Sequence, residues 1–464
     1  TPGYASVPGA WHTSADSSSA TPRIPVIPIS YGIANEILSR LHGRDIPNIG
    51  WQGGLAFRYH IAASASEPVR ATMSVEDDRN EQGGLKQIWD VVGTVPGTTF
   101  PDEWVIVGGH RDAWCYGAED NVSGCASVVA AAEAFAKLAK EGIRPKRSVL
   151  FVTWDAEEWG LLGSTEWVEQ LEKELGTKAI AYINQDECAT GSSFEASADP
   201  SLRTFVYDVA KAVPDGTGNP IYADWSRRAA PKVSGIDPIP TIGLLGGGSD
   251  FSPFYNHLGI PSLEHGFGGS FGEYHSNHDN IAWTLHFGDS TFRSHAATSQ
   301  FAAVEAMRLA NADILPLDFA AMGIWLRDAA QHEKSAAGSA GYDSAMFAPL
   351  LNAAQKFTQD GNEFDSIRNR AIEQTERSFT EVNQMLRDVE RSFTKSDGLF
   401  FDKWERNMLV LADPDNGYAD VRLPELNLSV RRKNRERLQS AVQDLTEATQ
   451  AACAKLEEAT QKLQ

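Results

Sequence analysis

The stretch SVLFVTWDAEEWGLLGS, residues 148–164, joins an apolar run to two adjacent glutamates. The run SVLFVTWD (148–155) is rich in β-branched and aromatic residues and predicts a buried strand. Side chains one residue apart on a strand or a helix point in different directions. Glu157 and Glu158 therefore cannot serve one purpose from one regular element, and we expect them on a strand-to-helix turn with different targets.

Strand and helix signals alternate around this stretch, from about residue 85 to residue 315. WVIVGGH (104–110) and AIAYINQD (179–186) predict further strands, and GCASVVAAAEAFAKLAKEG (124–142) predicts an amphipathic helix closed by Gly142. Such alternation indicates an α/β fold, in which a mixed or parallel sheet is flanked by helices on both faces.

The N-terminal flank reads differently. Residues 1–30 are rich in Pro, Ser and Gly and predict a loop, YGIANEILSRL (31–41) predicts a short helix, and LAFRYHIAA (55–63) predicts a strand. This part is expected to be a small mixed domain that ends near the polar segment EDDRNEQGG (76–84).

Beyond ILPLDF (314–319) the pattern changes to helices alone. Apolar residues recur at helical spacing in two stripes: Phe379, Val382, Leu386, Val389 and Phe393, and Leu438, Val442, Leu445, Ala448 and Ala452. We therefore predict three domains, at residues 1–85, 86–315 and 316–464, of which the last is all-helical.

Composition limits the class of protein. The 464 residues carry 41 Lys+Arg against 62 Asp+Glu, a net charge of −21, which argues against a nucleic-acid or anionic-membrane partner. No apolar stretch approaches the roughly 20 residues of a membrane helix, so no membrane segment is expected in this chain. The four cysteines are too few and too scattered for a disulfide framework.

Potential metal ligands follow the predicted strands, at the edge where open α/β sheets form their sites. These segments are GGHRD (108–112), DAEEWG (155–160) and NQDE (184–187), joined by the loops GAEDNVSG (117–124) and GFGGSFGEYHSNHDN (266–280). The candidate ligands are His110, Asp120, Glu157 or Glu158, Asp186 and His275. One bridging carboxylate with a His–carboxylate pair on each side is the donor set of a two-zinc site.

Simpler explanations exist for each residue alone. A single His or Asp at a strand end is more often a satisfied polar group than a ligand, and Glu-Glu before a helix often only complements the helix N-terminus. Candidates at the ends of five separate elements favour the metal interpretation.

At these residues the sequence resembles the glutamate carboxypeptidase II and transferrin receptor family of co-catalytic two-zinc peptidases. The resemblance runs through HRDAW, GAEDNVSG, SVLFVTWDAEEWGLLGSTEW, AYINQD, GGGSDF and YHSNHD, and extends weakly to both chain ends. It implies a protease-associated (apical) domain, here partial, over 1–85, a zinc peptidase domain over 86–315, and a helical dimerisation domain over 316–464.

The resemblance also implies roles. His110 and Glu158 would be terminal ligands on opposite zinc ions, Asp186 and His275 the remaining terminal ligands, and Asp120 the bridge. Glu157 would then be the general base, which gives the two adjacent glutamates their separate targets.

Three further features follow from the resemblance. Asp112 would orient the His110 imidazole, and the Tyr274 hydroxyl would hydrogen-bond the developing oxyanion. A cis peptide would follow Asp120. The family also holds one structural calcium ion, and its ligands would here be Thr1, Tyr4, Glu166 and Glu169, a hard oxygen set that suits calcium. Glu166 and Glu169 could instead be surface carboxylates on a helix.

The sequence departs from glutamate carboxypeptidase II where that enzyme grips acidic substrates. The arginines expected in LGIPSLEHGF (258–267) fall at about Glu264 and Gly266, an expected asparagine is Ser249, and a Lys-Tyr pair reads Gly417-Tyr418. Loss of charge-assisted contacts predicts poor turnover of glutamate-tailed peptides and a preference for neutral substrates. Glu264 could receive a free α-amino group, which slightly favours aminopeptidase over carboxypeptidase activity.

The expected protein is a zinc-dependent exopeptidase of short peptides that forms a homodimer through its helical domain and works in an extracellular, vacuolar or other extracytoplasmic compartment. The alternative is a catalytically silent receptor or scaffold similar to transferrin receptors, and intact ligands with Glu157 argue against it. A two-metal hydrolase of another amide is excluded only by the resemblance.

Overall fold

The computed structural model describes residues 26–47, 50–61, 69–74, 84, 86–229, 239–270, 272–372 and 378–464. The described residues fall into two compact units, one within Trp11–Gln87 and the other over Ile88–Gln464.

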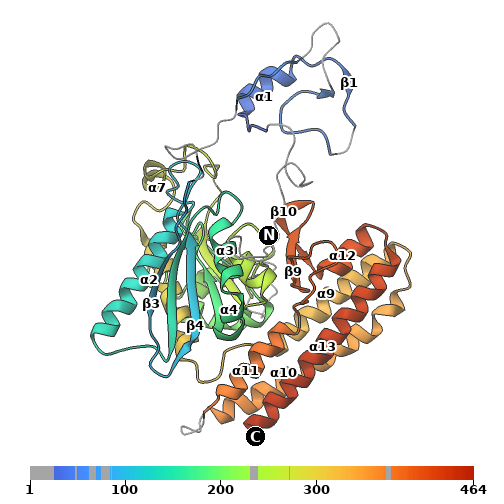
Figure 1. The fold of residues 1–464 in the computed structure, drawn as a ribbon. Coiled ribbons are helices and arrows are strands. Elements are labelled where there is room, and N and C mark those ends of the chain that lie inside the picture. Colours follow the sequence, from blue (N-terminus) through green and yellow to red (C-terminus); the bar gives the residue numbers. More distant parts are fainter. Residues whose placement is uncertain are drawn as a thin grey trace. The chain divides into compact units, whose positions relative to one another are not determined.

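The smaller unit contains little regular structure. Helix α1 (Tyr31–Leu38, blue in Figure 1) begins at Ser30, whose hydroxyl accepts a hydrogen bond from the Ile33 amide. Strands β1 (Arg44–Asp45) and β2 (His60–Ile61) pair antiparallel. The strand predicted over 55–63 is wrong for residues 55–59, which bend at 55–57 and form no strand, because Gln52 and Tyr59 bond the local backbone there. Residues 62–63 of that prediction lie outside the described residues.

The larger unit is built on a six-stranded mixed sheet with the strand order β3-β5-β4-β6-β8-β7. The strands are β3 (Val91–Val95), β4 (Phe100–His110), β5 (Arg147–Trp154), β6 (Ala179–Asn184), β7 (Ser193–Ala198) and β8 (Ser262–Gly268). The four central strands are parallel, and the edge strands β3 and β7 pair antiparallel. The predicted mixed sheet is confirmed.

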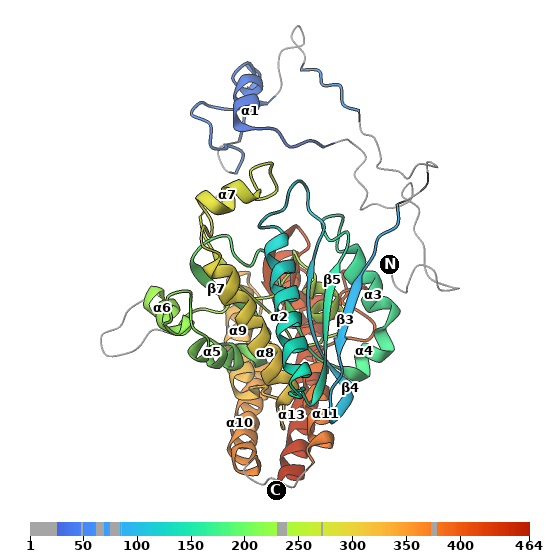
Figure 2. The same cartoon turned by 90° about the vertical axis from the view of Figure 1, so that its left-hand side faces the viewer.

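Helices cover both faces of this sheet, as the central strands require, because β5 and β6 are buried along almost their whole length. Figure 1 shows α2 (Val122–Lys140) on one face and α3 (Leu162–Gln170) and α4 (Glu172–Lys178) on the other. In Figure 2, α8 (Arg293–Asn311) lies beside α2. The remaining helices of this part are α5 (Arg203–Ala212), α6 (Ile221–Arg228) and α7 (Ile281–His286).

Among the described residues, α2 is the one helix long and apolar enough to span a membrane by length and composition. It packs on β4, β5 and α8, and Val128, Ala131 and Phe135 are buried in the core. About a third of this helix (33%) is buried.

The C-terminal part packs long helices side by side (orange to red in Figure 1). They are α9 (Phe319–Ser339), α10 (Ala348–Ala371), α11 (Thr380–Arg391), α12 (Pro424–Arg431) and α13 (Arg435–Leu463). The stripe predicted on α11 is buried, as is that on α13 apart from the half-buried Ala448.

The prediction of helices alone in this part is wrong. Strands β9 (Val410–Asp413) and β10 (Asn416–Arg422) form an antiparallel hairpin between α11 and α12. Pro414 and Asp415 form the turn between them, as these residue types favour. Leu423, in a left-handed backbone conformation, then caps the start of α12. The hairpin matters for function because Tyr418 on β10 lines the pocket described below.

Candidate metal centre

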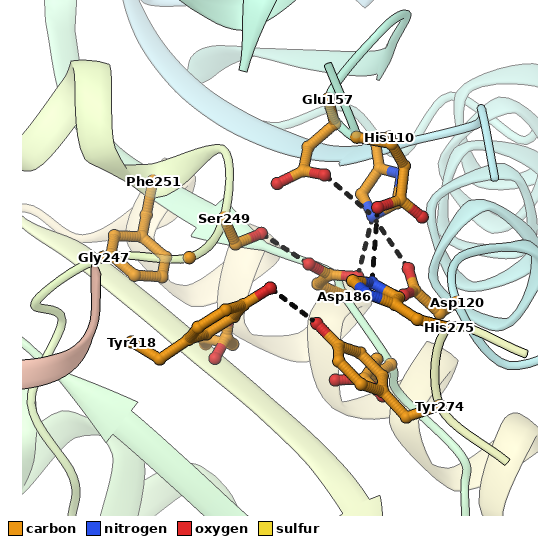
Figure 3. A pocket seen from close by; sticks show the side chains of 14 residues that line it. His110, Asp120, Glu157, Asp186, Gly247, Ser249, Phe251, Tyr274, His275 and Tyr418 are labelled. Carbon is orange, nitrogen blue, oxygen red and sulfur yellow. Dashed lines mark hydrogen bonds and ion pairs between the residues drawn. The ribbon is translucent and has the colours of Figure 1, made fainter. Parts of the chain in front are cut away.

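His110 is the last residue of β4, and its ring meets two carboxylates from neighbouring elements. Nε2 of His110 lies 3.1 Å from Oδ1 of Asp186 and 3.2 Å from Oδ1 of Asp120 (Figure 3). Asp186 follows β6, the parallel neighbour of β4, and Asp120 lies in the loop before α2. The three donors form a buried group that could hold a metal ion.

A second group lies on the other side of Asp120. Nε2 of His275 lies 3.0 Å from Oδ2 of Asp120 and 3.3 Å from Oε2 of Glu158. The two oxygens of Asp120 thus face different histidines. The sequence-predicted ligands come together as two triads, and Asp120 belongs to both.

The donor spacing fits zinc. Two donors bonded to one tetrahedral zinc ion at about 2.0–2.1 Å are roughly 3.3 Å apart, and the pairs given above are 3.0–3.3 Å apart. Oε1 of Glu158 is buried without a hydrogen-bond partner, as expected of a carboxylate shaped for a cation rather than for a donor. Imidazole nitrogen with carboxylate oxygen is also the donor chemistry of hydrolytic zinc sites.

Glu157 and Glu158 sit on the turn that follows β5. Ala156 adopts a left-handed conformation with φ 59°, and the Asp112 carboxylate accepts hydrogen bonds from the amides of Glu157 (2.9 Å) and Glu158 (3.2 Å). The turn aims Glu158 at His275, while Oε2 of Glu157 lies 3.9 Å from Nε2 of His110 (Figure 3). The two glutamates therefore face different parts of the pocket.

The two adjacent glutamates of the centre have raised pKa values. Burial, reinforced by Asp250, raises the pKa of Glu157 to about 9, and burial with Asp120 raises the pKa of Glu158 to about 8. Burial opposes protonation of His110, yet Asp186 and hydrogen bonds to Asp112 and Asp120 raise its pKa overall. A divalent cation among these groups would favour ionised carboxylates and neutral imidazoles instead.

Buried hydrogen bonds hold the backbone around Asp120, the candidate bridging residue. Asp279 accepts hydrogen bonds from the amides of Glu119 (2.7 Å) and Asp120 (3.0 Å). Nδ2 of Asn121 donates to the carbonyl oxygens of His110 (3.1 Å) and Gln185 (2.9 Å). The Asp120–Asn121 peptide is cis, as the resemblance predicts. Sequence reasoning missed Asn121, although it directly follows the bridging aspartate.

The candidate metal ligands line a pocket of about 320 Å³ together with the three predicted substrate-binding residues, Ser249, Glu264 and Tyr418. Oγ of Ser249 donates to Oδ2 of Asp186 (2.6 Å). Nδ2 of Asn184 donates to Ser249 (2.8 Å) and to Oε2 of Glu264 (2.6 Å). The pocket also contains Glu187, which sequence reasoning missed although it is the neighbour of Asp186.

Tyr274 lines the same pocket, next to Tyr418. Its hydroxyl is 3.3 Å from that of Tyr418, and its ring stacks on that of His275 with centroids 3.7 Å apart (Figure 3). Its hydroxyl therefore faces the pocket from beside a metal ligand.

The predicted calcium ligands are only partly described. Thr1 and Tyr4 lie outside the described residues. Glu166 and Glu169 lie on α3, and Oε1 of Glu169 accepts a hydrogen bond from Nε1 of Trp404 (2.7 Å). Glu169 is thus buried against the C-terminal part of the chain.

Comparisons with known proteins agree with this arrangement. Residues 90–291 match peptidase family M28, and residues 345–457 match the transferrin receptor-like dimerisation domain. This chain is therefore similar to the M28 peptidase family over residues 90–291. The M28 match spans the sheet and all five candidate zinc ligands.

The curated relatives are named as glutamate carboxypeptidases and aminopeptidases. The chain is 30% identical to "Probable glutamate carboxypeptidase LAMP1" of Arabidopsis thaliana over 91% of this chain and 59% of the relative. It is 32% identical to "Probable glutamate carboxypeptidase VP8" of Zea mays over 92% of this chain and 60% of the relative. It is 30% identical to "Aminopeptidase NAALADL1" of Mus musculus over 77% of this chain and 50% of the relative. This chain therefore spans only 50–60% of the length of these relatives.

Proposed function

We propose that this chain is a zinc-dependent exopeptidase of short peptides that holds two zinc ions. His110 and Asp186 would bind one ion, Glu158 and His275 the other, and Asp120 both. The observation that carries the proposal is the geometry of Asp120, whose two carboxylate oxygens lie 3.2 Å and 3.0 Å from two different histidines. A receptor or scaffold has no need of this arrangement.

The pair of ions, when bound, supplies Lewis-acid activation of the peptide carbonyl and of a water molecule. Glu157 is placed to take the proton from that water and to deliver it to the leaving amine, because its carboxylate borders the pocket and lies outside both triads. The Tyr274 hydroxyl is placed to donate to the carbonyl oxygen as negative charge develops there. Asp112 fixes the turn that separates Glu157 from Glu158.

The pocket supports unblocked rather than glutamate-tailed substrates. Among the described residues that line it there is no lysine or arginine, and Glu187 and Glu264 add two further carboxyl groups. An acidic substrate side chain would be repelled, whereas a free α-amino group could be received by Glu264. Aminopeptidase activity is therefore slightly favoured over carboxypeptidase activity.

Two further parts of the proposal concern assembly and a second metal. The residues that match the transferrin receptor-like dimerisation domain would pair two chains into a homodimer. Glu166 and Glu169, with Thr1 and Tyr4, would hold one structural calcium ion.

The test combines metal content with hydrolysis of an unblocked and a blocked substrate. About two zinc ions per chain, with hydrolysis of leucine or alanine p-nitroanilide, would support the two-zinc exopeptidase. Efficient cleavage of an N-blocked peptide that ends in glutamate, without anilide hydrolysis, would contradict the specificity. A chain that binds no zinc and hydrolyses neither substrate would be the receptor or scaffold instead.

A further inference from the structure

A second cavity, of about 310 Å³, shares Asp186, Glu187 and Glu264 with the metal pocket. It also contains Glu195, which does not line the metal pocket. We call this cavity the acidic chamber and define it by Glu187, Glu195 and Glu264. Because it shares a wall with a metal ligand, a group in the chamber lies next to the reacting part of a bound substrate.

Strand register creates the chamber. Strands β7 and β8 pair antiparallel, with Glu195 opposite Gly266 and Ser197 opposite Glu264. Side chains two residues apart on a strand share a face, so Glu195 and Glu264 are diagonal neighbours on one face of the sheet. The residue opposite Glu195 is a glycine, and the backbone of Cys188 packs against it, 3.1 Å from where a Cβ atom would lie. Glu187 approaches from the segment after β6.

Carboxyl groups line the chamber, and the described residues of its walls supply no cation to balance those that ionise. No lysine or arginine is among the described residues that line it. His265 lines it too, but Nδ1 of His265 lies 3.2 Å from Oε2 of Glu305, and both side chains are fully buried. Glu264 accepts a hydrogen bond from the neutral amide of Asn184. Like charges on one sheet face repel each other, and a cation from outside would relieve that repulsion.

We propose that the acidic chamber receives a cationic group of the substrate, the side chain of a lysine or arginine next to the scissile bond. The inference rests on the proposed peptidase function. It replaces the preference for neutral substrates that the sequence predicts by a preference for basic residues. An α-amino group has the same ammonium chemistry. Glu195, however, lines the chamber and does not line the metal pocket. A group that reaches Glu195 must extend past Glu264, which requires a long side chain.

The test compares two substrates that differ in charge at almost constant shape, arginine p-nitroanilide and citrulline p-nitroanilide. We expect kcat/KM for arginine to exceed that for citrulline by about tenfold or more, since one charge-assisted contact is worth about that factor. In Glu195→Gln this ratio should fall to about threefold or less. Higher ionic strength should also lower the ratio in the wild type.

The matched control is Glu141→Gln, which removes the same charge at the far end of α2, about 28 Å of helix from the metal centre. It should leave the arginine-to-citrulline ratio unchanged. Comparison of leucine p-nitroanilide with its Nα-acetyl form reports separately on the α-amino group. An effect of acetylation without an effect of citrulline would assign the cation site to the α-amino group and overturn the proposal.

A binding measurement separates failure of the chamber from failure of the peptidase function. Calorimetric titration of zinc-loaded protein with arginine amide and with citrulline amide should give tighter binding of arginine amide, reduced in Glu195→Gln. If no anilide is hydrolysed but arginine amide binds preferentially, the peptidase function fails and the chamber stands. Equal binding and equal kcat/KM for the two ligands would overturn the chamber.

Discussion

The hydroxyl oxygens of Tyr274 and Tyr418 lie 3.3 Å apart, although 144 positions separate the two residues in the chain. Tyr274 comes from the loop that carries the ligand His275, and Tyr418 from the hairpin strand β10. The C-terminal part of the chain therefore completes the pocket of the sheet. Burial raises the pKa of Tyr274, so its hydroxyl keeps its proton and remains a hydrogen-bond donor.

Tyr274→Phe should lower kcat about 10²-fold with little change in KM, because the lost hydrogen bond would form mainly in the transition state. The measurement is steady-state hydrolysis of leucine p-nitroanilide. Tyr418→Phe is the matched control, since the same atom is removed from the outer member of the pair, and it should cost less than about tenfold. Equal losses in the two variants would contradict the role of Tyr274.

Glu157→Gln should keep both zinc ions and the fold but lose activity by about 10²–10⁴-fold, the usual contribution of a general base. The neighbouring change, Glu158→Gln, should lose zinc as well as activity, because Oε2 of Glu158 lies 3.3 Å from Nε2 of His275 in the second triad. Zinc content and kcat are measured on both variants. Loss of zinc in Glu157→Gln with retention in Glu158→Gln would mean that the two roles are exchanged.

Asp279→Asn should weaken zinc binding by about 10–100-fold, as loss of a group that orients a ligand usually does. The wild-type carboxylate accepts the amides of Glu119 and Asp120, and an asparagine would turn its own N–H₂ toward one of them. Zinc affinity is measured by competition with a chelator.

Asp289→Asn is the control for this change. Asp289 likewise accepts two backbone amides, those of Arg293 and His295, both at 3.0 Å, but at the start of α8. It should lower thermal stability while leaving zinc affinity unchanged. Equal zinc affinity in wild type and Asp279→Asn would show that the loop does not position the bridge.

Sequence patterns carried enough information to predict the mixed sheet and the convergence of the candidate ligands at one of its edges. The central strands are continuous apolar runs, and parallel strands end at one edge, so the residues after them had to converge. His110, Asp186 and the turn of Glu157 and Glu158 follow from this rule alone. Asp120 and His275 lie on loops, and there the resemblance had to supply their roles.

Other features depended on pairings that periodicity does not reveal. The hairpin β9–β10 was missed because its strands are short and β10 carries an irregularity in register between Asn416 and Asp420. The acidic chamber depends on the register that sets Glu195 opposite Gly266. A shift of one residue would move Glu195 to the other face of the sheet.

The final prediction concerns the helical part, where Glu333 on α9 is 2% exposed. Its Oε1 accepts a hydrogen bond from Nδ2 of Asn427 on α12 (3.1 Å), and its Oε2 is buried without a hydrogen-bond partner. Burial raises the pKa of Glu333, although Asn427 opposes the shift. A carboxyl whose pKa is higher in the folded state favours folding while protonated, and this stabilisation is lost as pH rises above the unfolded value of 4.5.

Glu333→Gln stays neutral, so its melting temperature relative to wild type should rise between pH 5 and pH 8, by on the order of 2 °C. The measurement is thermal unfolding at both pH values, with Glu363→Gln on the exposed face of α10 as the control that should show no such change. A difference between Glu333→Gln and wild type that is the same at pH 5 and pH 8 would show that Glu333 is equally ionised in the folded and unfolded chain.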